Sequence, residues 1–503
     1  MLRHMNSHSE DWSSVNWKKF QKNLFRLQKR IYKAMQNGDL RKVKNLQRLV
    51  LKSRAARMLA VRQVTQLNSG KKICGIDGKK SLNFRERLNL VLKLKRANNW
   101  EHQGLREVKI LKKNGKIRTL KIPTIADRAW QCLVKYALEP AHEITFHARS
   151  YGFRPGRSTQ DAQQFVFNNL KSRVKGYEKR VIELDIEKCF DRINHNEIMK
   201  RVIAPQQIKM GLWECLKAGV SAEFPEQGTP QGGVVSPLLA NIALNGIEDI
   251  HPSVRYADDM VFFLKPKDDA EKILEKVQQF LTKRGMNVSA EKIKITRTTA
   301  GFDFLGWHFK VQKNGKFRCT PSEENYENFR KKVKTIVNNS VLATATKAKK
   351  LGPIIRGWRN YHRYCRMDGS RFSLWYLNHD AFKTFIKDKN KGKNEAIELV
   401  KQAFPAVPYS ENKFVMVKGN KSPYDGDSIY WSKRNSKLYD GHTEKALKRQ
   451  GYKCGHCGNY LDGNEKVELH HTDGNHDNWK PKNLLAVHEL CHDYIHMGKR
   501  PQA

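Results

Sequence analysis

Apolar side chains recur at helical spacing near the start of the chain, with lysines and arginines between them. Two such series lie within residues 12–66, and they consist of Leu24, Leu27, Ile31 and of Leu46, Leu49, Val50. This spacing gathers each series on one face of a helix, so residues 12–66 are predicted to form basic amphipathic helices. Residues 325–386 repeat the pattern and predict a second set of basic helices.

Between these two regions, short apolar runs alternate with helical stretches. Residues 108–111 and 117–122 predict a hairpin with its turn at 113–116. Residues 181–186 predict one strand, and 254–264 predict two strands joined by a tight turn at two aspartates. Helices are expected between them at 236–248 and 268–284. This order predicts an α+β sheet with helices on one face.

The last part of the chain changes character twice. Residues 387–445 are polar, rich in Lys, Asn and Gly, and interrupted by prolines, so we expect a loosely structured linker or small domain. Residues 446–503 are rich in Cys and His and predict a compact unit. No internal repeat is evident.

The net charge of the chain indicates which class of partner it binds. The 503 residues suffice for three or four domains, and 95 Lys and Arg face 50 Asp and Glu, a formal charge of +45. Such an excess would oppose folding by self-repulsion unless a polyanion offsets it, and nucleic acid is the expected one. No run approaches the roughly 18 apolar residues of a membrane span, and no secretory leader opens the chain. We therefore expect a cytoplasmic, bacterial protein that acts on nucleic acid rather than at a membrane.

Three acidic residues carry the strongest chemical signal. Asp258 and Asp259 are adjacent at a tight strand–turn–strand, where two carboxylates repel each other unless a divalent cation lies between them. Asp185 ends the strand at 181–186, and two strands meeting in one sheet would bring it beside that pair. Three such carboxylates can hold two Mg²⁺ ions roughly 4 Å apart, as in-line phosphoryl transfer requires.

With these acids in place, the sequence resembles reverse transcriptases, most closely those encoded by group II introns. The resemblance covers nearly the whole chain and follows the order of that family's motifs. Seven blocks carry it: Gly75–Gly78, Ile122–Arg128, Ser150–Ser158, Glu183–Asp191, Gly228–Pro237, Tyr256–Asp259 and Phe304–Trp307. It implies a right-hand polymerase with fingers, a palm with an antiparallel sheet and packed helices, and an α-helical thumb.

The resemblance also implies roles at the nucleotide. Phe190 matches the steric gate, whose ring would clash with a ribonucleotide 2′-hydroxyl and so favour dNTPs. Gln231 would contact the nucleotide or the template base. Arg118 and Arg154 are candidates for holding the triphosphate, because a guanidinium binds phosphate in a bidentate way. The expected general acid for the leaving group is one of two lysines, Lys292 or Lys294.

Residues 354–365 have apolar side chains at helical spacing, with Arg356, Arg359 and Arg363 around them. By itself this pattern indicates a helix with a packed face and a solvated basic face. Maturases resemble the chain here through a Gly-Trp-x-x-Tyr stretch, which implies that the three arginines bind intron RNA. The basic helices at 12–66 are expected to share that role.

Cysteine spacing near the C-terminus predicts a metal site. Cys454 and Cys457 form one ligand pair, and His488 and Cys491 form a second, which together make a Cys₃His tetrahedral zinc pattern. Four protein ligands leave no open position, so this zinc is expected to be structural. The remaining cysteines are expected to be reduced packing residues: Cys74, Cys132, Cys189, Cys215, Cys319 and Cys365.

The histidines around this pattern resemble those of HNH endonucleases, with a ββα-metal arrangement. By that resemblance His471 is the general base, and Asn483 braces the loop that carries it. His470, His492 and His496 would hold one catalytic divalent ion, Mg²⁺ or Mn²⁺. His488 departs from the family, in which cysteine is common at that position, and it can still bind zinc.

These patterns together predict five regions. They are a basic helical extension at 1–80, fingers and palm at 81–319, a thumb or maturase domain at 320–386, a DNA-binding region or linker at 387–445, and an HNH endonuclease at 446–503.

The predicted function is that of a group II intron-encoded protein, with intron RNA, target DNA and dNTPs as partners. It would support splicing as a maturase, nick target DNA, and extend the nick by target-primed reverse transcription. Two alternatives stay open. One is a splicing cofactor whose catalytic sites have decayed, and the other is a different class of bacterial reverse transcriptase.

Overall fold

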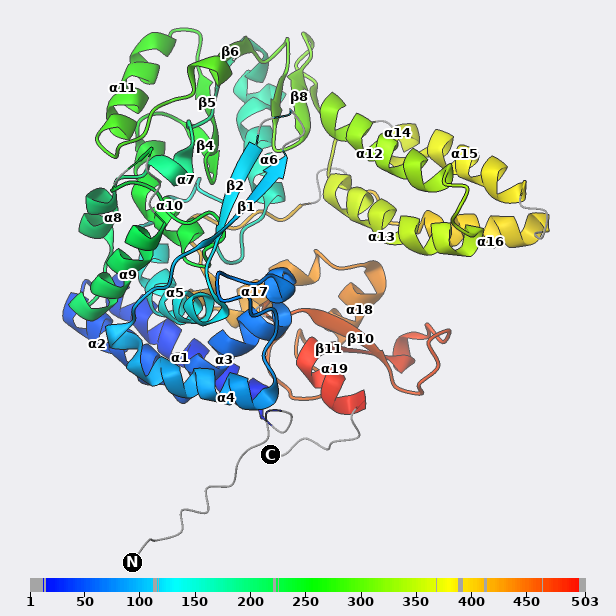
Figure 1. The fold of residues 1–503 in the computed structure, drawn as a ribbon. Coiled ribbons are helices and arrows are strands. Elements are labelled where there is room, and N and C mark those ends of the chain that lie inside the picture. The colour runs from blue at the N-terminus through cyan, green and yellow to red at the C-terminus, as the bar shows by residue number, and fades with distance from the viewer. Residues whose placement is uncertain are drawn as a thin grey trace, which may run out of the picture.

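The computed structural model shows a main body, a projecting group of helices (α12–α16) and a small C-terminal module that contains α18 and α19 (Figure 1). The residues that the structure describes are 12, 15–111, 115, 117–219, 223–224, 226–367, 369–387, 392–410, 414–463 and 465–496. The predicted turn at 113–116 lies outside these residues, apart from Gly115.

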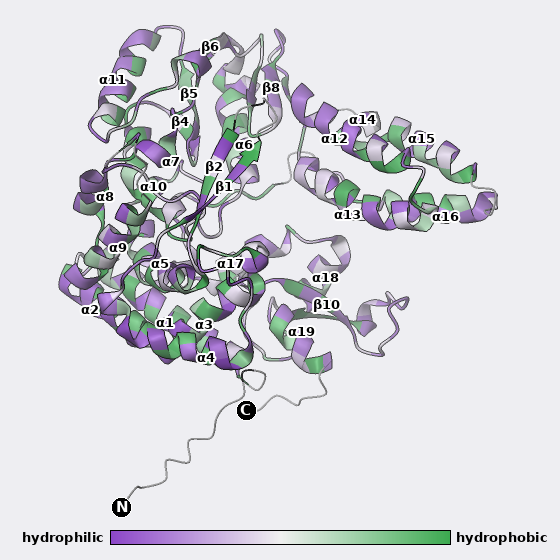
Figure 2. Ribbon diagram, in the orientation of Figure 1, coloured by the Kyte–Doolittle hydropathy of each residue, from purple (hydrophilic) through white to green (hydrophobic). Residues whose placement is uncertain are grey.

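The basic amphipathic helices predicted at the N-terminus are confirmed. They are α1 (Trp17–Gln36), α2 (Leu40–Lys52) and α3 (Arg54–Arg62). Asn16, Asp39 and Ser53 cap them by accepting hydrogen bonds from backbone amides of the first turn. Their apolar faces pack against α5 (Ile125–Thr145), although Leu49 lies on the solvent side. Figure 2 shows the resulting alternation of hydrophilic and hydrophobic residues along α1 and α2.

A four-stranded antiparallel sheet occupies the centre of the main body, with strand order β4-β5-β3-β6. Its strands are β3 (Arg180–Leu184), β4 (Ser253–Tyr256), β5 (Asp259–Leu264) and β6 (Lys294–Arg297). The strands expected at 181–186 and within 254–264 are therefore confirmed. The sheet has a core on both faces, which corrects the expectation of helices on one face only.

Alternation along the strands explains the two cores, because successive side chains point to opposite faces. Ile182 and Phe262 join the larger core with helices α5 and α10. Val181 and Phe263 join a second core, which includes α6 and the strands β7–β9. The helices around the sheet are α6 (Thr159–Leu170), α7 (Cys189–Arg192), α8 (His195–Arg201), α9 (Gln206–Ala218), α10 (Ser236–Leu244) and α11 (Ala270–Thr282).

Two smaller strand groups flank this sheet. The predicted hairpin is present as β1 (Arg106–Leu111) and β2 (Ile117–Ile122), and it follows α4 (Phe84–Lys93). A three-stranded antiparallel sheet is formed by β7 (Phe302–Phe304), β8 (Trp307–Val311) and β9 (Phe317–Pro321). Trp307 of β8 is fully buried and stacks on Tyr361 with ring centroids 4.5 Å apart, which joins this sheet to the helical group beyond it.

The projecting group contains α12 (Glu323–Val337), α13 (Thr344–His362), α14 (Gly369–Ser373), α15 (Trp375–Ile386) and α16 (Lys393–Ala403). Helix α16 packs against both α13 and α15. The helical thumb therefore extends to about residue 403, which corrects the expected boundary at 386. The signal was present in the sequence, since the buried Ala396, Val400 and Ala403 follow helical spacing.

Residues 414–436, which include α17 (Ser428–Ser436), are also more ordered than the linker we expected. Arg434 donates two hydrogen bonds of 3.0 Å to the carboxylate of Asp161, and both side chains are almost fully buried. The Asp161 carboxylate also accepts a hydrogen bond from the backbone amide of Val417. The Trp431 ring is 1% exposed and packs on Gly156. This segment is thus fixed to the main body through α6 and the loop before it.

Replacing Arg434 by methionine is expected to lower the free energy of unfolding by about 3–5 kcal/mol, because the buried charge of Asp161 loses its partner. Urea denaturation of the full chain measures this loss. The double variant Asp161→Asn with Arg434→Met should recover part of the stability, since it removes the unpaired charge. Equal stability of the single variant and the wild type would contradict the role of this ion pair.

The C-terminal module consists of α18 (Gly441–Arg449), the antiparallel pair β10 (Val467–His471) and β11 (Leu484–His488), and α19 (Glu489–His496). Helix α19 packs on both strands, so the module has a ββα arrangement around a small core of its own. None of the helices that the structure describes combines the length and the apolar character needed to cross a membrane.

Candidate functional site

The central sheet brings the three predicted acids together. Leu184 pairs with Met260, which places Asp185 level with Asp259 at the same edge of the sheet. Tyr256 pairs with Asp259 across β4 and β5, and the turn between them holds Asp258. Residues 73 positions apart in the sequence thus share one end of the sheet.

The electrostatics of these acids show that they interact. Desolvation by the surrounding protein, together with the charges of Asp258 and Asp185, raises the pKa of Asp259 to about 7. Desolvation also raises the pKa of Asp258, and the charge of Asp185 adds to that rise. Such carboxylates are costly to keep charged next to each other, and oxygen-preferring divalent cations relieve that cost. The chemistry of this donor set therefore fits Mg²⁺.

A lysine lies among the acids. Lys292 forms an ion pair with Asp185, and this hydrogen bond raises the pKa of Lys292. Lys294, the other candidate, pairs in the register of β3 and β6 with Glu183, which lies two residues before Asp185. Of the two lysines, Lys292 is thus the one that contacts the acids. Two groups of side chains near the C-terminus, described below, each place their donor atoms within 4.8 Å of one another. The oxygens of the three acids are less tightly grouped than that.

The residues expected at the nucleotide form a connected network beside the acids. The Gln231 side-chain amide donates to both carboxylate oxygens of Asp191 at 3.0 Å, and its oxygen accepts from Arg118 Nε at 2.7 Å. Phe190 is half-buried, and its carbonyl accepts a hydrogen bond of 2.6 Å from the backbone amide of Thr229. The loop that carries Gln231 is thereby fixed to α7 and to the β1–β2 hairpin.

Two details of this network were not predicted. Asp191 was not singled out, although it directly follows Phe190 in a matched block. The close approach of the loop to β2 also requires glycine at position 232, where φ is +139° and a Cβ atom would lie 2.8 Å from the carbonyl oxygen of Lys121.

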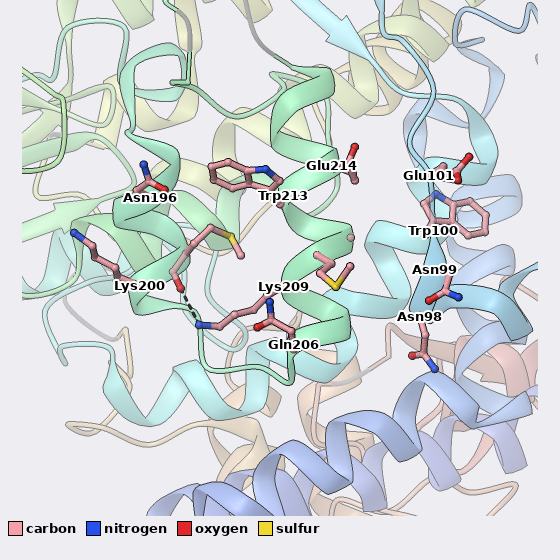
Figure 3. Close-up of a pocket in the computed structure, with 13 residues that line it drawn as sticks. Asn98, Asn99, Trp100, Glu101, Asn196, Lys200, Gln206, Lys209, Trp213 and Glu214 are labelled. Atoms are coloured by element: carbon pink, nitrogen blue, oxygen red, sulfur yellow. Dashed lines mark hydrogen bonds between the residues drawn. The ribbon is translucent and has the colours of Figure 1, made fainter.

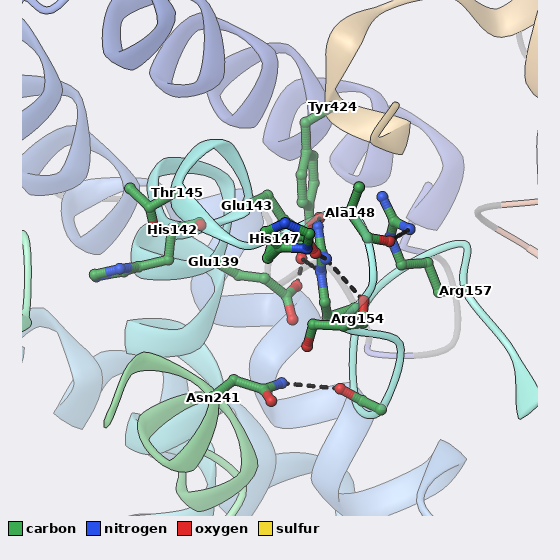
Figure 4. A network of polar contacts seen from close by, with 12 residues as sticks. Glu139, His142, Glu143, Thr145, His147, Ala148, Arg154, Arg157, Asn241 and Tyr424 are labelled. Carbon is green, nitrogen blue, oxygen red and sulfur yellow. Dashed lines mark hydrogen bonds and ion pairs between the residues drawn. The ribbon is translucent and has the colours of Figure 1, made fainter. Parts of the chain in front are cut away.

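The structure places Arg154 elsewhere than the sequence suggested. Arg154 is 5% exposed, and its guanidinium binds Glu143 through two hydrogen bonds of 3.0 Å and donates to the carbonyls of His147 and Ser150. Figure 4 shows this network, in which Tyr424 also donates to Glu139. All the polar atoms of Arg154 are used inside the protein, so the expectation that it binds a triphosphate is wrong.

The three arginines that we expected to bind RNA lie in different environments. Arg356 is exposed on α13, as an RNA-binding residue requires. Arg359 is buried and donates to the carbonyls of Phe404, Pro405 and Ser373. Arg363 is also buried, and it donates to a backbone carbonyl and lies over the Tyr364 ring. Arg359 therefore joins segments of the thumb, and Arg363 links the thumb to Leu438, which follows α17. The burial of both side chains argues against the contact with RNA that we expected.

In the C-terminal module, the predicted zinc ligands lie in one cluster. Cys454 and Cys457 follow α18, whereas His488 ends β11 and Cys491 lies in the first turn of α19. Their donor atoms all lie within 4.8 Å of one another. Three thiols and an imidazole at such distances are a donor set that fits a tetrahedral Zn²⁺.

A second cluster lies nearby on α19. His470 of β10 and His492 and His496 of α19 also place their donor atoms within 4.8 Å of one another. His492 Nε2 and His496 Nε2 are 3.2 Å apart, since these residues share one helical face. This group fits one divalent ion that leaves further positions open.

His471 follows His470 in the same strand and therefore points to the opposite face. It is 6% exposed, and neither ring nitrogen has a hydrogen-bond partner within the described residues. The rings of His476 and Trp479 lie 5.1 Å from it. Asn483 accepts hydrogen bonds from Thr472 and Asp473 and donates to the carbonyl of Asn478, which fixes the loop after His471.

A cavity of about 1020 Å³ lies apart from all these sites, between Trp100 and helices α8 and α9 (Figure 3). Trp213, Met199 and Met210 line it, together with polar side chains such as Asn98. None of the predicted site residues lines this cavity, so we do not assign the chemistry to it.

An antiparallel sheet with three interacting carboxylates at one edge, next to a fixed glutamine loop, defines a nucleic acid polymerase. Comparisons with known proteins agree. Residues 110–309 match the family described as reverse transcriptase (RNA-dependent DNA polymerase). Residues 12–94 match the N-terminal domain of reverse transcriptase, and residues 326–397 match the maturase-specific domain of group II introns.

Individual relatives indicate which group of reverse transcriptases the chain belongs to. The maturase-like protein 1 of Euglena gracilis is 38% identical over 77% of this chain and 85% of its own length. The group II intron-encoded protein LtrA of Lactococcus lactis is 27% identical over 46% of this chain and 51% of its own. A solved telomerase from Candida albicans aligns with 61% of this chain and 62% of its own, at a TM-score of 0.32 and 12% identity. The chain belongs to the group II intron reverse transcriptase and maturase family.

Proposed function

We propose that this reverse transcriptase and maturase is a multifunctional intron-encoded protein that also nicks DNA. It copies intron RNA into cDNA from a nicked target strand, and it assists the splicing of that RNA. The observation that carries the polymerase part is the convergence of Asp185, Asp258 and Asp259 at one edge of the sheet. The +45 charge supports RNA and DNA as its partners.

The side chains around the acids have distinct roles in this proposal. Two Mg²⁺ ions, when bound by Asp185, Asp258 and Asp259, supply charge stabilisation for in-line transfer. Phe190 places its ring where a ribose 2′-hydroxyl would lie, so that dNTPs are preferred. Gln231 and Arg118 position the incoming nucleotide. Lys292 supplies the proton to the leaving pyrophosphate.

The nicking activity rests on His471 and its surroundings. The imidazole of His471 is buried, and neither of its nitrogens has a hydrogen-bond partner within the described residues, so it is available as a general base for water. Asn483 holds the loop that follows it. His470, His492 and His496 would hold a divalent ion, which would supply charge stabilisation at the scissile phosphate. The Cys₃His cluster holds Zn²⁺ and stabilises the module.

One preparation tests the whole proposal. Purified protein, combined with the intron RNA that flanks its reading frame, should show splicing, strand-specific nicking and cDNA synthesis under the same conditions. A splicing cofactor with decayed catalytic sites would splice without extending a primer. A reverse transcriptase of another class would extend a primer without promoting splicing.

Replacing His471 by alanine is expected to lower the nicking rate by about 10²–10⁴-fold, because the general base is removed. Nicking of a labelled target duplex measures this loss, while primer extension on a pre-nicked duplex should stay at the wild-type rate. His442→Ala is a suitable control, since His442 also packs on Trp479 but lies outside both metal clusters. Nicking at the wild-type rate by the His471 variant would place the base elsewhere.

A further inference from the structure

Helix α15 of the thumb carries aromatic side chains that the fold leaves open to solvent. Trp375 is 56% exposed and Tyr376 is 76% exposed. The ring of His379 stacks on Trp375, with centroids 5.1 Å apart and an angle of 12° between the planes. We call Trp375, Tyr376 and His379 the aromatic stripe.

The aromatic stripe is not needed to pack the helix. The other face of α15 places Leu377, Ala381 and Phe385 in the thumb core, and all three are buried. Large apolar side chains gathered on a surface indicate contact with a partner more often than those scattered singly. A flat and partly preformed stack of rings is moreover suited to a planar partner.

A groove of about 270 Å³ lies between α12 and α15, and the residues that line it on α15 alternate in sequence with those of the stripe. Lys334 of α12 and Lys383 of α15 line it, together with polar groups of Asn338 and Thr384 and one carboxylate, Asp380. Lys383 lies two helical turns after Tyr376 and therefore shares its face of α15. One lysine thus shares the face of α15 that carries the exposed rings, two turns along the helix.

The net charge of the thumb indicates which kind of partner binds the aromatic stripe. Residues 323–387 contain fourteen lysines and arginines but only five acidic residues. A second copy of this chain would bring two strongly basic surfaces together, which electrostatics disfavours. A polyanion with planar groups matches both the rings and the lysines, and single-stranded RNA is such a partner.

We propose that the aromatic stripe binds unpaired bases of a single-stranded RNA loop, while Lys334 and Lys383 lie along its phosphates. The site rests on the proposed function, because the RNA is the intron RNA. The aromatic stripe is exposed and can contact RNA, whereas Arg359 and Arg363 are buried. Stacking accepts any base, so the site recognises an unstacked loop rather than a sequence.

The test compares RNA binding by the full-length protein and its variants. The double variant Trp375→Ala with Tyr376→Ala removes the stripe, and Trp375→Phe with Tyr376→Phe keeps aromatic rings at both positions. Val341→Ala is the matched control, because Val341 is 91% exposed on the same thumb. Affinity is measured by filter binding for the flanking intron RNA and for a short oligouridine, and cross-linking of 4-thiouridine RNA maps the contact.

The alanine pair is expected to weaken intron RNA binding roughly five- to hundredfold and to abolish cross-links to residues 375–383. The phenylalanine pair should retain most of the affinity, and Val341→Ala should bind like the wild type. Lys334→Ala with Lys383→Ala should reduce the salt dependence of binding.

Wild-type affinity of the alanine pair, or a shift in oligomeric state on gel filtration, would overturn the inference. In either case the proposed function stands, provided that the wild-type protein binds the intron RNA and promotes splicing. If the wild type does neither, the proposed function itself fails. Primer extension on a short generic template reports on folding, and it should be unchanged in every variant.

Discussion

Replacing Asp258 and Asp259 together by alanine should abolish cDNA synthesis while intron RNA binding and splicing continue. The two carboxylates and Asp185 lie at one edge of the sheet. Besides desolvation, the charges of Asp258 and Asp185 raise the pKa of Asp259, and the charge of Asp185 raises the pKa of Asp258. Without them, the metal ions that stabilise the charge of the transition state lose their ligands. That stabilisation is worth several kcal/mol, so synthesis should fall at least about a thousandfold.

Primer extension with labelled dNTPs measures the polymerase, and filter binding measures the RNA complex. Glu187→Gln is the matched control, because it removes a nearby acidic charge that pairs with Arg192 at 3.0 Å and lies outside the group of three. The control should extend primers at the wild-type rate. Appreciable extension by the double alanine variant would refute the assignment of these acids.

The pattern of apolar residues predicts most elements of the fold because each has one buried face. The N-terminal helices, the hairpin and the strands that carry Asp185 and Asp259 all fall where their spacing indicates. The two-sided core of the sheet was harder to predict. Its strands are short, and a run such as Met260–Leu264 is apolar at every position, so no alternation reveals which elements cover which face.

The errors among the predicted site residues have a common physical origin. An arginine in a sequence looks the same whether its guanidinium faces solvent or internal carbonyls. Arg154 and Arg359 use their donors within the protein, on partners that only the folded chain brings near. The same holds for Arg434 and Asp161, which lie 273 positions apart.

Spacing in the sequence predicted the Cys₃His cluster correctly, because its ligands come in pairs that are close in sequence. Cys454 and Cys457 are close in sequence, as are His488 and Cys491. The short backbone between the two residues of each pair keeps their side chains near each other in the cluster. His470 and His471 separate to opposite faces because they are neighbours in a strand. Their different roles, which the resemblance to HNH endonucleases implied, stay a prediction.

Removing the metal from the Cys₃His cluster should unfold the C-terminal module and leave the polymerase intact. His488 and Cys491 flank the start of α19, and that helix carries His492 and His496. A zinc ion bound at the cluster would therefore fix the helix that carries the proposed nuclease site. The core of this module is small, and structural zinc contributes about 10–16 kcal/mol in comparable small domains.

The variant Cys457→Ala should contain no zinc by mass spectrometry, whereas the wild type should contain one ion per chain. Limited proteolysis should cleave the variant within residues 446–496, and nicking should be lost. Primer extension should continue at the wild-type rate, because the strands next to the three acids pack in the larger core, to which the module contributes Leu490 alone among the described residues. Cys74→Ala is the control, since Cys74 lies outside the cluster and should leave zinc content unchanged. A protease-resistant module without zinc would show that its core alone maintains the fold.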